Sequence, residues 1–379
     1  AEAHRRCAEL YGELATLGIR GSQIVDSRPI SCCKFSPILG SGAAAAELET
    51  TRVLTGSWTG LLKVWDAAKL QPTVVCRGHT ERVVGCDWHP EAAFSTALSS
   101  DAELYPSPRL LASASADATV KLWDARIHTA KVVGERPVAG AKEEEDADAM
   151  DIEGPAPKTK GVFERSAACL GTFTGHKARL SRVAFHTMGR LLGTTSFDHT
   201  WRLWDVETRK ELQLQDGHLK PVYGIAFHPD GSLVATTDLY GITLLWDLRS
   251  GKQIHKCIGH VKRVLCVDFS PEGWKMATAG DDHAVKIWDL RERRCLYTIP
   301  AHANLVTGVR YCSQSGEALM SCSFDGKVKV WSTRDYSCLQ TLTGHEGKVM
   351  GGDVSHSERH VASVGFDRTL KIWARDVLA

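Results

Sequence analysis

Residues 259–289 read GHVKRVLCVDFSPEGWKMATAGDDHAVKIWD, and this stretch decides the fold of the chain. It opens on a Gly-His pair and closes on a Trp-Asp pair, with 28 positions between the His and the Trp. Between them, alternating apolar residues are broken by turn-forming Ser-Pro-Glu-Gly and Asp-Asp, a pattern that favours strands over helices. We expect strands at 264–269, 275–279 and 284–288.

The same frame returns along most of the chain. The last five of its tryptophans are 42, 42, 43 and 42 residues apart. The series is Trp65, Trp123, Trp204, Trp246, Trp288, Trp331 and Trp373. A self-similar period of this length indicates a repeat architecture, and it overrides the two or three domains that 379 residues would otherwise suggest.

A period of 40 to 45 residues with a GH…WD frame is typical of WD40 repeats, and the chain resembles the WD40 β-propellers. The resemblance implies an all-β fold, a seven-bladed WD40 β-propeller over residues 18–379. Trp373 lies six residues from the end of the chain, so the last blade lacks an outer strand of its own. We expect the segment 18–25 to supply that strand and close the ring.

Residues 1–17 are predicted to form a short N-terminal helix. Cys7, Leu10, Tyr11, Leu14 and Leu17 would share one face of it. Docking against the propeller and binding to a partner are both open for this face. The chain begins AEAH without a methionine, which suggests a fragment of a longer protein.

Charge is unevenly spread along the chain. The formal net charge is +1, yet residues 143–153, EEEDADAMDIE, hold seven acids and no base. This run belongs to an insert, expected to be disordered over about 134–162, because it is polar and rich in like charge, Pro and Gly. A second loop, 90–108, also breaks the period. The rest of the chain is mildly basic, which leaves an RNA-containing partner and a neutral partner both open.

Cysteine usage and hydropathy bound the location of the protein. The 12 cysteines show no CxxC and no His/Cys metal spacing, so we expect reduced, buried thiols in a reducing compartment. No apolar run reaches membrane length. We expect an intracellular protein with no membrane partner, no metal and no cofactor.

The WD40 resemblance also implies a polar network in each blade, made by a His, a Ser or Thr, an Asp and a Trp. Indole donates, carboxylate accepts, and hydroxyl and imidazole can each do both, so the four side chains suit one another. Blades 1 and 4 depart from this pattern, with Thr59 and Tyr240 at the Asp position, and are expected to depend more on apolar packing. The network residues are His79, Ser113, Asp117 and Trp123 in blade 2; His176, Thr194, Asp198 and Trp204 in blade 3; His260, Thr278, Asp282 and Trp288 in blade 5; His302, Ser321, Asp325 and Trp331 in blade 6; and His345, Ser363, Asp367 and Trp373 in blade 7.

Ser, His and Asp in one network also fit a hydrolase. The set recurs in five blades, whereas catalysis needs one site, and no strained nucleophile turn such as GxSxG appears. We therefore expect no catalysis and no small-molecule substrate.

Propellers of this kind bind partners mainly through loops at one face, called the top. The resemblance places two sets of residues there, one at the start of the first strand of each blade and one before the network Asp. Cations alternate with aromatic rings in these sets, which suits a partner surface or stacked bases. The candidate binding residues are Trp58, Arg82, Arg179, Phe197, Tyr223, Arg263, Phe324, Lys348 and Phe366.

Four strings are less generic. They are SRPISCCKFSP (27–37), GRLLGTTSFDHTWRLWDVE (189–207), RRCLYTIPAHANLVTGV (293–309) and LTGHEGKVMG (342–351). They resemble the propellers of the pre-mRNA-processing factor 4 family, the WD40 subunits of the U4/U6 small nuclear ribonucleoprotein. The AH in place of GH at 301–302 is an idiosyncrasy within that likeness.

This second resemblance implies a noncatalytic scaffold in the nucleus that takes part in pre-mRNA splicing. The implied partners are pre-mRNA-processing factor 3 and the spliceosomal cyclophilin, with U4/U6 RNA nearby. The fuller N-terminal region expected in this family is missing from these residues, and the cyclophilin contact depends on it in part. Another WD40 adaptor, such as a ubiquitin-ligase substrate receptor that binds short peptides, remains the alternative.

Overall fold

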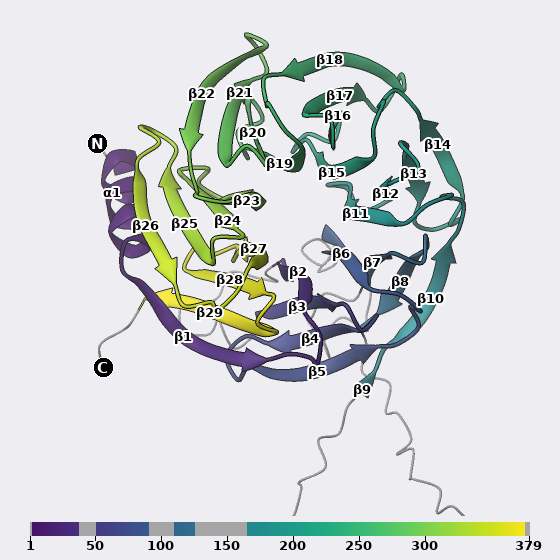
Figure 1. Ribbon diagram of the computed structural model, residues 1–379, viewed down its shortest axis with the longest axis horizontal. Helices are drawn as coiled ribbons and strands as arrows, with labels where there is room; N and C mark the ends of the chain where they lie inside the picture. The colour runs from purple at the N-terminus through teal and green to yellow at the C-terminus, as the bar shows by residue number, and fades with distance from the viewer. Residues whose placement is uncertain (1, 38–50, 91–109, 126–164, 376–379) are drawn as a thin grey trace, which may run out of the picture.

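The computed structural model describes residues 2–37, 51–90, 110–125 and 165–375. Within these ranges the chain forms seven sheets set as blades around a central axis, as Figure 1 shows, and one helix beside them. The predicted acidic insert and the core of the loop at 90–108 lie outside the described residues. The seven-bladed propeller is confirmed.

The strands follow the chain around the ring, each blade running outward from its innermost strand. Blade 1 holds β2 (Ile30–Phe35), β3 (Arg52–Ser57), β4 (Leu62–Asp66), β5 (Gln71–Cys76) and the short parallel β9 (Arg165–Ser166). Blade 2 holds β6 (Val83–Trp88), β7 (Leu110–Ser115), β8 (Val120–Asp124) and β10 (Ala168–Phe173). Blade 3 holds β11 (Leu180–Phe185), β12 (Leu191–Ser196), β13 (Trp201–Asp205) and β14 (Glu211–Gln215).

The remaining blades repeat the arrangement. Blade 4 holds β15 (Val222–Phe227), β16 (Leu233–Asp238), β17 (Ile242–Asp247) and β18 (Lys252–Ile258). Blade 5 holds β19 (Val264–Phe269), β20 (Lys275–Gly280), β21 (Ala284–Asp289) and β22 (Arg294–Pro300), so the three strands predicted there are confirmed to within one residue. Blade 6 holds β23 (Val306–Tyr311), β24 (Ala318–Ser323), β25 (Lys327–Ser332) and β26 (Cys338–Thr343).

Blade 7 joins the two ends of the described chain. Its strands are β27 (Val349–Val354), β28 (His360–Gly365), β29 (Thr369–Arg375) and β1 (Leu17–Ile24). β1 runs antiparallel to β29 and forms the outer edge of the sheet (Figure 1). The Nζ of Lys371 also donates to the Oγ of Ser22 at 2.9 Å. The predicted closure of the ring by an N-terminal strand is therefore confirmed, and it covers the edge that β29 would otherwise expose.

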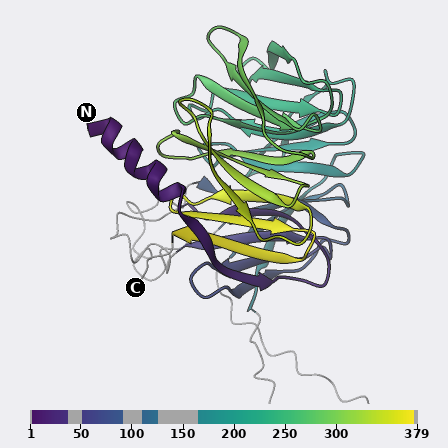
Figure 2. The same ribbon diagram turned by 60° about the vertical axis from the view of Figure 1, so that its left-hand side comes forward.

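The helix α1 (Glu2–Leu14) is shorter than the predicted 1–17, because Leu17 is already the first residue of β1. Its C-terminal half docks on the outside of blade 6. Leu14 is fully buried there, and the Tyr11 hydroxyl donates to the Glu317 carbonyl at 3.0 Å. The other end of the helix leans away from the ring, as Figure 2 shows. The side chain of Cys7 is not among the described ones.

The five predicted polar networks come together in blades 2, 3, 5, 6 and 7. In each, the His Nδ1 lies 2.7–2.9 Å from an Asp Oδ2, and the His Nε2 lies 2.8 Å from a Ser or Thr hydroxyl. The Trp Nε1 donates to that same hydroxyl at 2.7–2.9 Å. Because the carboxylate only accepts, Nδ1 carries the proton and Nε2 accepts from the hydroxyl.

Blade 4 corrects the expectation from the sequence. It has a complete network, in which the His218 Nδ1 lies 2.9 Å from Asp238 Oδ2 and the His218 Nε2 lies 2.7 Å from Thr236 Oγ1. Trp246 donates to Thr236 at 2.8 Å. The carboxylate comes from Asp238, two positions before Tyr240, at the end of β16. The prediction that apolar packing replaces the network here was wrong.

Blade 1 keeps a reduced version. Asp26 stands four residues before Ile30, where the other blades have their His, and Thr59 stands at the Asp position. The Thr59 hydroxyl donates to the Asp26 carboxylate at 2.6 Å. The two positions are therefore still hydrogen-bonded, but the acceptor now stands at the His position and the donor at the Asp position. Trp65 donates to Thr55 at 2.8 Å, as in the other blades.

The charge states of these networks follow from their bonds. Burial raises the pKa of Asp367, but hydrogen bonds from His345 and Thr369 outweigh it and hold the pKa at about 2. Burial disfavours the charged imidazole and lowers the pKa of His79 and of His302, despite their Asp partners. Neutral imidazole facing an ionised carboxylate is the resulting pair in these blades.

The thiols differ in part from the expectation. Eleven described cysteines are free, and eight of them are buried. However, Cys169 and Cys338 are exposed and Cys295 is half-buried; each lies near the start of an outer strand, opposite the network Trp, whereas Cys76 and Cys257 end or nearly end such strands and are buried. The prediction of buried thiols was therefore wrong at these three equivalent positions.

Candidate partner-binding face

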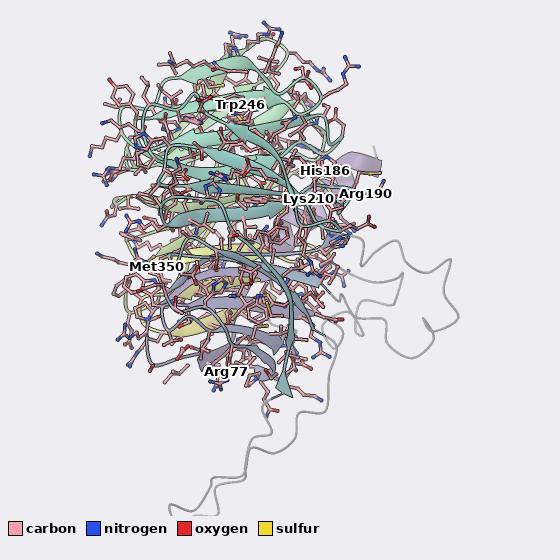
Figure 3. All side chains as sticks on the ribbon, turned by 90° about the vertical axis from the view of Figure 1, so that its right-hand side faces the viewer. Arg77, His186, Arg190, Lys210, Trp246 and Met350 are labelled. Atoms are coloured by element: carbon pink, nitrogen blue, oxygen red, sulfur yellow. The ribbon has the colours of Figure 1, made fainter. Side chains whose placement is uncertain are left out.

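The strands of each blade alternate in direction, so the ring has two faces of different make-up. The top face carries the turn between the second and third strand of each blade and the loop that leads to the next blade. Figure 3 sets Met350 at the top face and His186 and Arg190 at the opposite one. The described ranges break off after Pro37, Pro90 and Ala125, each of which follows a first or third strand, so these ends lie at the opposite face.

The two predicted sets of top-face residues meet pair by pair. In all seven blades, the backbone N–H of the residue after the second strand donates to the carbonyl of the residue before the first strand, at 2.8–3.1 Å. The pairs are Trp58 with Pro29, Ala116 with Arg82, Phe197 with Arg179, Leu239 with Pro221, Asp281 with Arg263, Phe324 with Leu305, and Phe366 with Lys348. Each blade therefore presents two side chains from one bonded corner.

One group of these side chains spans blades 6, 7, 1 and 2. Trp58 packs edge to face on Phe366, with ring centroids 5.2 Å apart, and the Arg82 guanidinium lies 5.1 Å from the Trp58 ring. The Lys348 ammonium lies 4.9 Å from the ring of Phe324 in blade 6 and 6.0 Å from Phe366. Phe366 keeps 41% of its surface exposed. The group thus links four blades through alternating cations and rings.

A second group lies on blades 3 and 4. The Arg179 guanidinium lies 3.9 Å from the Phe197 ring, which packs at 6.4 Å against Tyr223 of β15. Arg182 approaches the other side of Tyr223 at 5.3 Å. Arg263 of blade 5 is exposed and makes no ion pair within the described part of the chain.

Both groups border one depression of about 300 Å³ at the mouth of the central channel. Seven of the nine predicted binding residues line it, whereas Lys348 and Phe366 lie beyond its wall. The surface is polar at its cations and apolar at its rings, which is the composition of sites that bind peptides or bases rather than of a dry catalytic pocket.

Sequence reasoning missed Arg182. It stands third on an innermost strand, where the other six blades have only small residues, namely Cys32, Gly85, Gly224, Cys266, Gly308 and Gly351. Those small residues leave room for its side chain, whose Nη1 donates to the Val84 carbonyl at 2.6 Å. A long basic residue in this column was the signal that aligning the repeats could have found.

Below the depression the channel is lined by charged groups from five inner strands. Lys34 lies 3.9 Å from Asp87 and 3.8 Å from Asp353, and Arg310 lies 3.3 Å from Asp268. The carboxylates also accept backbone N–H groups of neighbouring blades, as Asp353 does from Phe35 at 2.9 Å. Burial raises the pKa of Asp87 and of Asp268. These groups bind one blade to the next.

The Ser, His and Asp groups of the networks do not form an accessible nucleophile. The hydroxyl-bearing residues Ser113, Ser321 and Ser363 are 0% exposed and already accept from a tryptophan. Within the described ranges, no three His, Cys, Asp or Glu side chains gather as a metal site. The search of those same residues for a helix long and apolar enough to cross a membrane also found none.

Comparison with known proteins gives the same architecture. Residues 70–124, 167–205, 209–247, 251–289, 293–332 and 336–374 match the family model for the WD domain, G-beta repeat. The chain is 40% identical over 364 residues to the U4/U6 small nuclear ribonucleoprotein PRP4 of Saccharomyces cerevisiae, which covers 95% of this chain and 65% of the yeast protein. The chain therefore spans a little under two thirds of that relative.

Two further relatives cover less of the chain. An uncharacterized WD repeat-containing protein of Schizosaccharomyces pombe is 37% identical over 47% of this chain and 26% of its own length. The nuclear distribution protein PAC1 of Arthroderma otae is 30% identical over 47% of this chain and 40% of its own. These matches extend over about half of the ring, whereas the likeness to PRP4 extends around nearly all of it.

Proposed function

Because the chain belongs to the WD40-repeat family, whose propellers present loops to partners, we propose that it is a noncatalytic scaffold subunit of the U4/U6 and U4/U6.U5 small nuclear ribonucleoproteins. It acts in pre-mRNA splicing, in the nucleus. The observation that carries the proposal is the 40% identity to PRP4 over 95% of the chain. A shared repeat alone would match only the positions that build blades.

The top face supports a scaffold role. Each of the seven blades presents there two residues joined by a backbone hydrogen bond, and several of their rings and cations pack on one another before any partner arrives. Preordered aromatic and arginine side chains lose little freedom on binding and are common among the residues that dominate interfaces. The proposed binding residues are the nine predicted ones, with Arg182 added.

The proposed partners follow the resemblance to the pre-mRNA-processing factor 4 family. They are pre-mRNA-processing factor 3 and the spliceosomal cyclophilin, with U4/U6 RNA close by. Proteins are the main partners of the top face in this proposal. The basic balance of the chain outside residues 143–153 favours a place beside RNA.

The test is purification of the tagged chain from nuclear extract, followed by sequencing of the RNA and identification of the proteins that accompany it. Enrichment of U4 and U6 RNA supports the proposal. Ubiquitin-ligase subunits without these RNAs would replace it with the adaptor alternative.

A double variant locates the interface. Arg263→Glu with Phe324→Ala changes two side chains that line the depression, and we expect it to reduce recovery of the partners while leaving the thermal melt nearly unchanged. Its control is Met188→Ala with Arg190→Glu, which changes an apolar residue more exposed than the half-buried Phe324 and an arginine on the opposite face. Equal recovery by both double variants would move the interface away from the top face.

A further inference from the structure

The turn of blade 4 differs from the turns of the other network blades. In blades 2, 3, 5, 6 and 7, the tip of the turn between the second and third strand carries the network aspartate. In blade 4 the aspartate has moved back to Asp238, which is 1% exposed, and its Oδ1 accepts the N–H groups of Tyr240 and Ile242, each at 2.9 Å. The tip position is thereby released from the network. Tyr240 occupies it and keeps 63% of its surface exposed.

The loop between blades 4 and 5 flanks this tip on one side. A Cβ on Gly241 would lie 2.7 Å from the carbonyl oxygen of Lys262 and 3.0 Å from that of His260, so the turn rests directly on this loop. Val261 lies between His260 and Lys262 in this loop and is 88% exposed. Ile258, 68% exposed, ends β18 and pairs with Ile242 in the sheet.

The loop between blades 3 and 4 flanks the tip on the other side. In blade 3, the N–H of Lys177, the residue after the network His, donates to the tip residue Asp198 at 3.0 Å. Leu219 is the residue after the network His in blade 4 and so takes the position of Lys177, in a loop that bonds to the turn through His218 and Asp238. It is 77% exposed. Three segments thus bring four large apolar side chains to the tip of blade 4.

This concentration is specific to blade 4. At the position of Ile258 the other blades carry Arg77, Thr174, Asp216, Pro300, Thr343 and, in blade 7, Ile24, which is the one other large apolar residue there. At the position of Tyr240 the other blades with a complete network carry an aspartate. Isolated exposed apolar residues are ordinary on a protein surface, whereas several that gather in one place mark an interaction site.

The charges around the four apolar side chains are mostly positive. Lys220, Lys256, Lys262 and Arg263 lie in the same segments and are exposed, and Asp216 is the one exposed acid of residues 216–220, 239–242 and 256–263. Two half-buried acids of the next turn also lie beside the site: Asp281 donates its backbone N–H to the Arg263 carbonyl, and the Asp282 carboxylate accepts the N–H of Val261. None of the four bases forms an ion pair with a described residue. Complementarity of charge therefore points to a negatively charged partner.

We propose that the tip of blade 4, formed by Leu219, Tyr240, Ile258 and Val261 within a basic border, docks an acidic segment of a partner protein that carries apolar anchor residues. The phosphates of a nucleic acid would pair with the lysine and arginine side chains, but they would leave the three aliphatic side chains without an apolar surface to contact. The inference does not depend on the splicing assignment.

The experiment uses the full chain with the photo-crosslinking residue p-benzoylphenylalanine at position 261, irradiated in nuclear extract. The crosslinked partner segment is mapped by mass spectrometry, synthesised, and titrated against the protein. We expect a segment with net negative charge and apolar residues spaced along it. Its affinity should fall at least tenfold for Tyr240→Ser with Val261→Ser, and at least tenfold for Lys220→Glu with Lys262→Glu.

The controls separate this site from a general surface effect. The same photo-crosslinker at Met188, on the opposite face and 66% exposed, should not capture that segment. The variant Lys210→Glu with Arg190→Glu reverses two charges on the opposite face and should bind the peptide as the wild type does. Crosslinks to RNA, to a basic or wholly polar segment, or to residues 134–162 of this chain would overturn the proposal, as would the absence of a crosslink stronger than that from position 188.

Discussion

Moving the carboxylate of blade 4 back to the tip tests how the blade is held. We predict that Asp238→Ser destabilises the propeller and that adding Tyr240→Asp restores most of the loss. The double variant recreates the Ser-x-Asp order of blade 3, where Ser196 ends the second strand and Asp198 stands at the tip. There the Asp198 Oδ2 lies 2.9 Å from the His176 Nδ1.

The magnitude follows from the bonds that Asp238 accepts. In Asp238→Ser the buried N–H of His218 loses its acceptor, which costs about 1–3 kcal/mol because both side chains are nearly inaccessible to water. The N–H groups of Tyr240 and Ile242 lose theirs as well, at about 0.5–1.5 kcal/mol each, since the turn can hydrate them. The single change should therefore lower the free energy of unfolding by about 4 kcal/mol, and the double variant should lie within about 1 kcal/mol of the wild type.

Denaturant unfolding followed by tryptophan fluorescence measures this in four proteins: the wild type, both single variants and the double variant. Tyr240→Asp alone is the control, because it adds a carboxylate without removing one, and it should cost less than Asp238→Ser. A double variant no more stable than Asp238→Ser would refute the reasoning, since the two positions would then not exchange their roles. If Asp238→Ser left the free energy of unfolding unchanged, the hydrogen bonds of Asp238 would not stabilise blade 4.

Two other perturbations have defined outcomes. Removing residues 1–24 should leave the outer side of β29 unpaired and cause self-association, which size-exclusion chromatography detects. Removing residues 1–15 takes away α1 but keeps β1, and should leave a monomer. If the two truncated proteins behave alike, β1 does not close the ring. Acidification should lower the stability between about pH 6.5 and pH 4, because burial and the nearby Arg20 and Arg359 lower the pKa of His360 to about 4, so that the unfolded chain binds a proton there before the folded chain does. His360→Asn should flatten the loss of stability in that window, as measured by denaturant titration at each pH, and an unaltered slope would show that His360 does not cause it.

The ring and five of its networks could be predicted from the sequence because each repeat carries its own chemistry at fixed spacing. The resemblance to WD40 propellers placed two sets of residues at the top face, but the backbone hydrogen bonds that join them in pairs came from the structure. What failed was the assumption that a role belongs to one position. In blade 4 the carboxylate reaches the same imidazole from Asp238, because the end of β16 and the tip of the turn both lie within reach of His218.

Blade 1 failed in a related way. Asp26 precedes the first strand of the ring, where no Gly-His pair marks it, yet it bonds to Thr59. Both cases could have been found by asking where each missing partner went, since a buried donor without an acceptor is costly. The mild basicity and the exposed apolar residues of blade 4 were visible in the sequence, but their convergence needed the register of Ile242 with Ile258 and the contact at Gly241.

Because the first strand pairs with the last, the propeller cannot close until synthesis of the chain is nearly complete. Ser22 and Lys371 touch across 349 positions, so at 5–20 residues per second the ribosome delivers the partner of the opening strand roughly 20–70 s after that strand has emerged. Throughout this interval the backbone groups of β1 in the nascent chain are unpaired and can form hydrogen bonds with a strand of another chain. Chaperones that shield newly made edges should thus matter more to this protein than to a helical one of equal length, whose contacts are complete within a few turns.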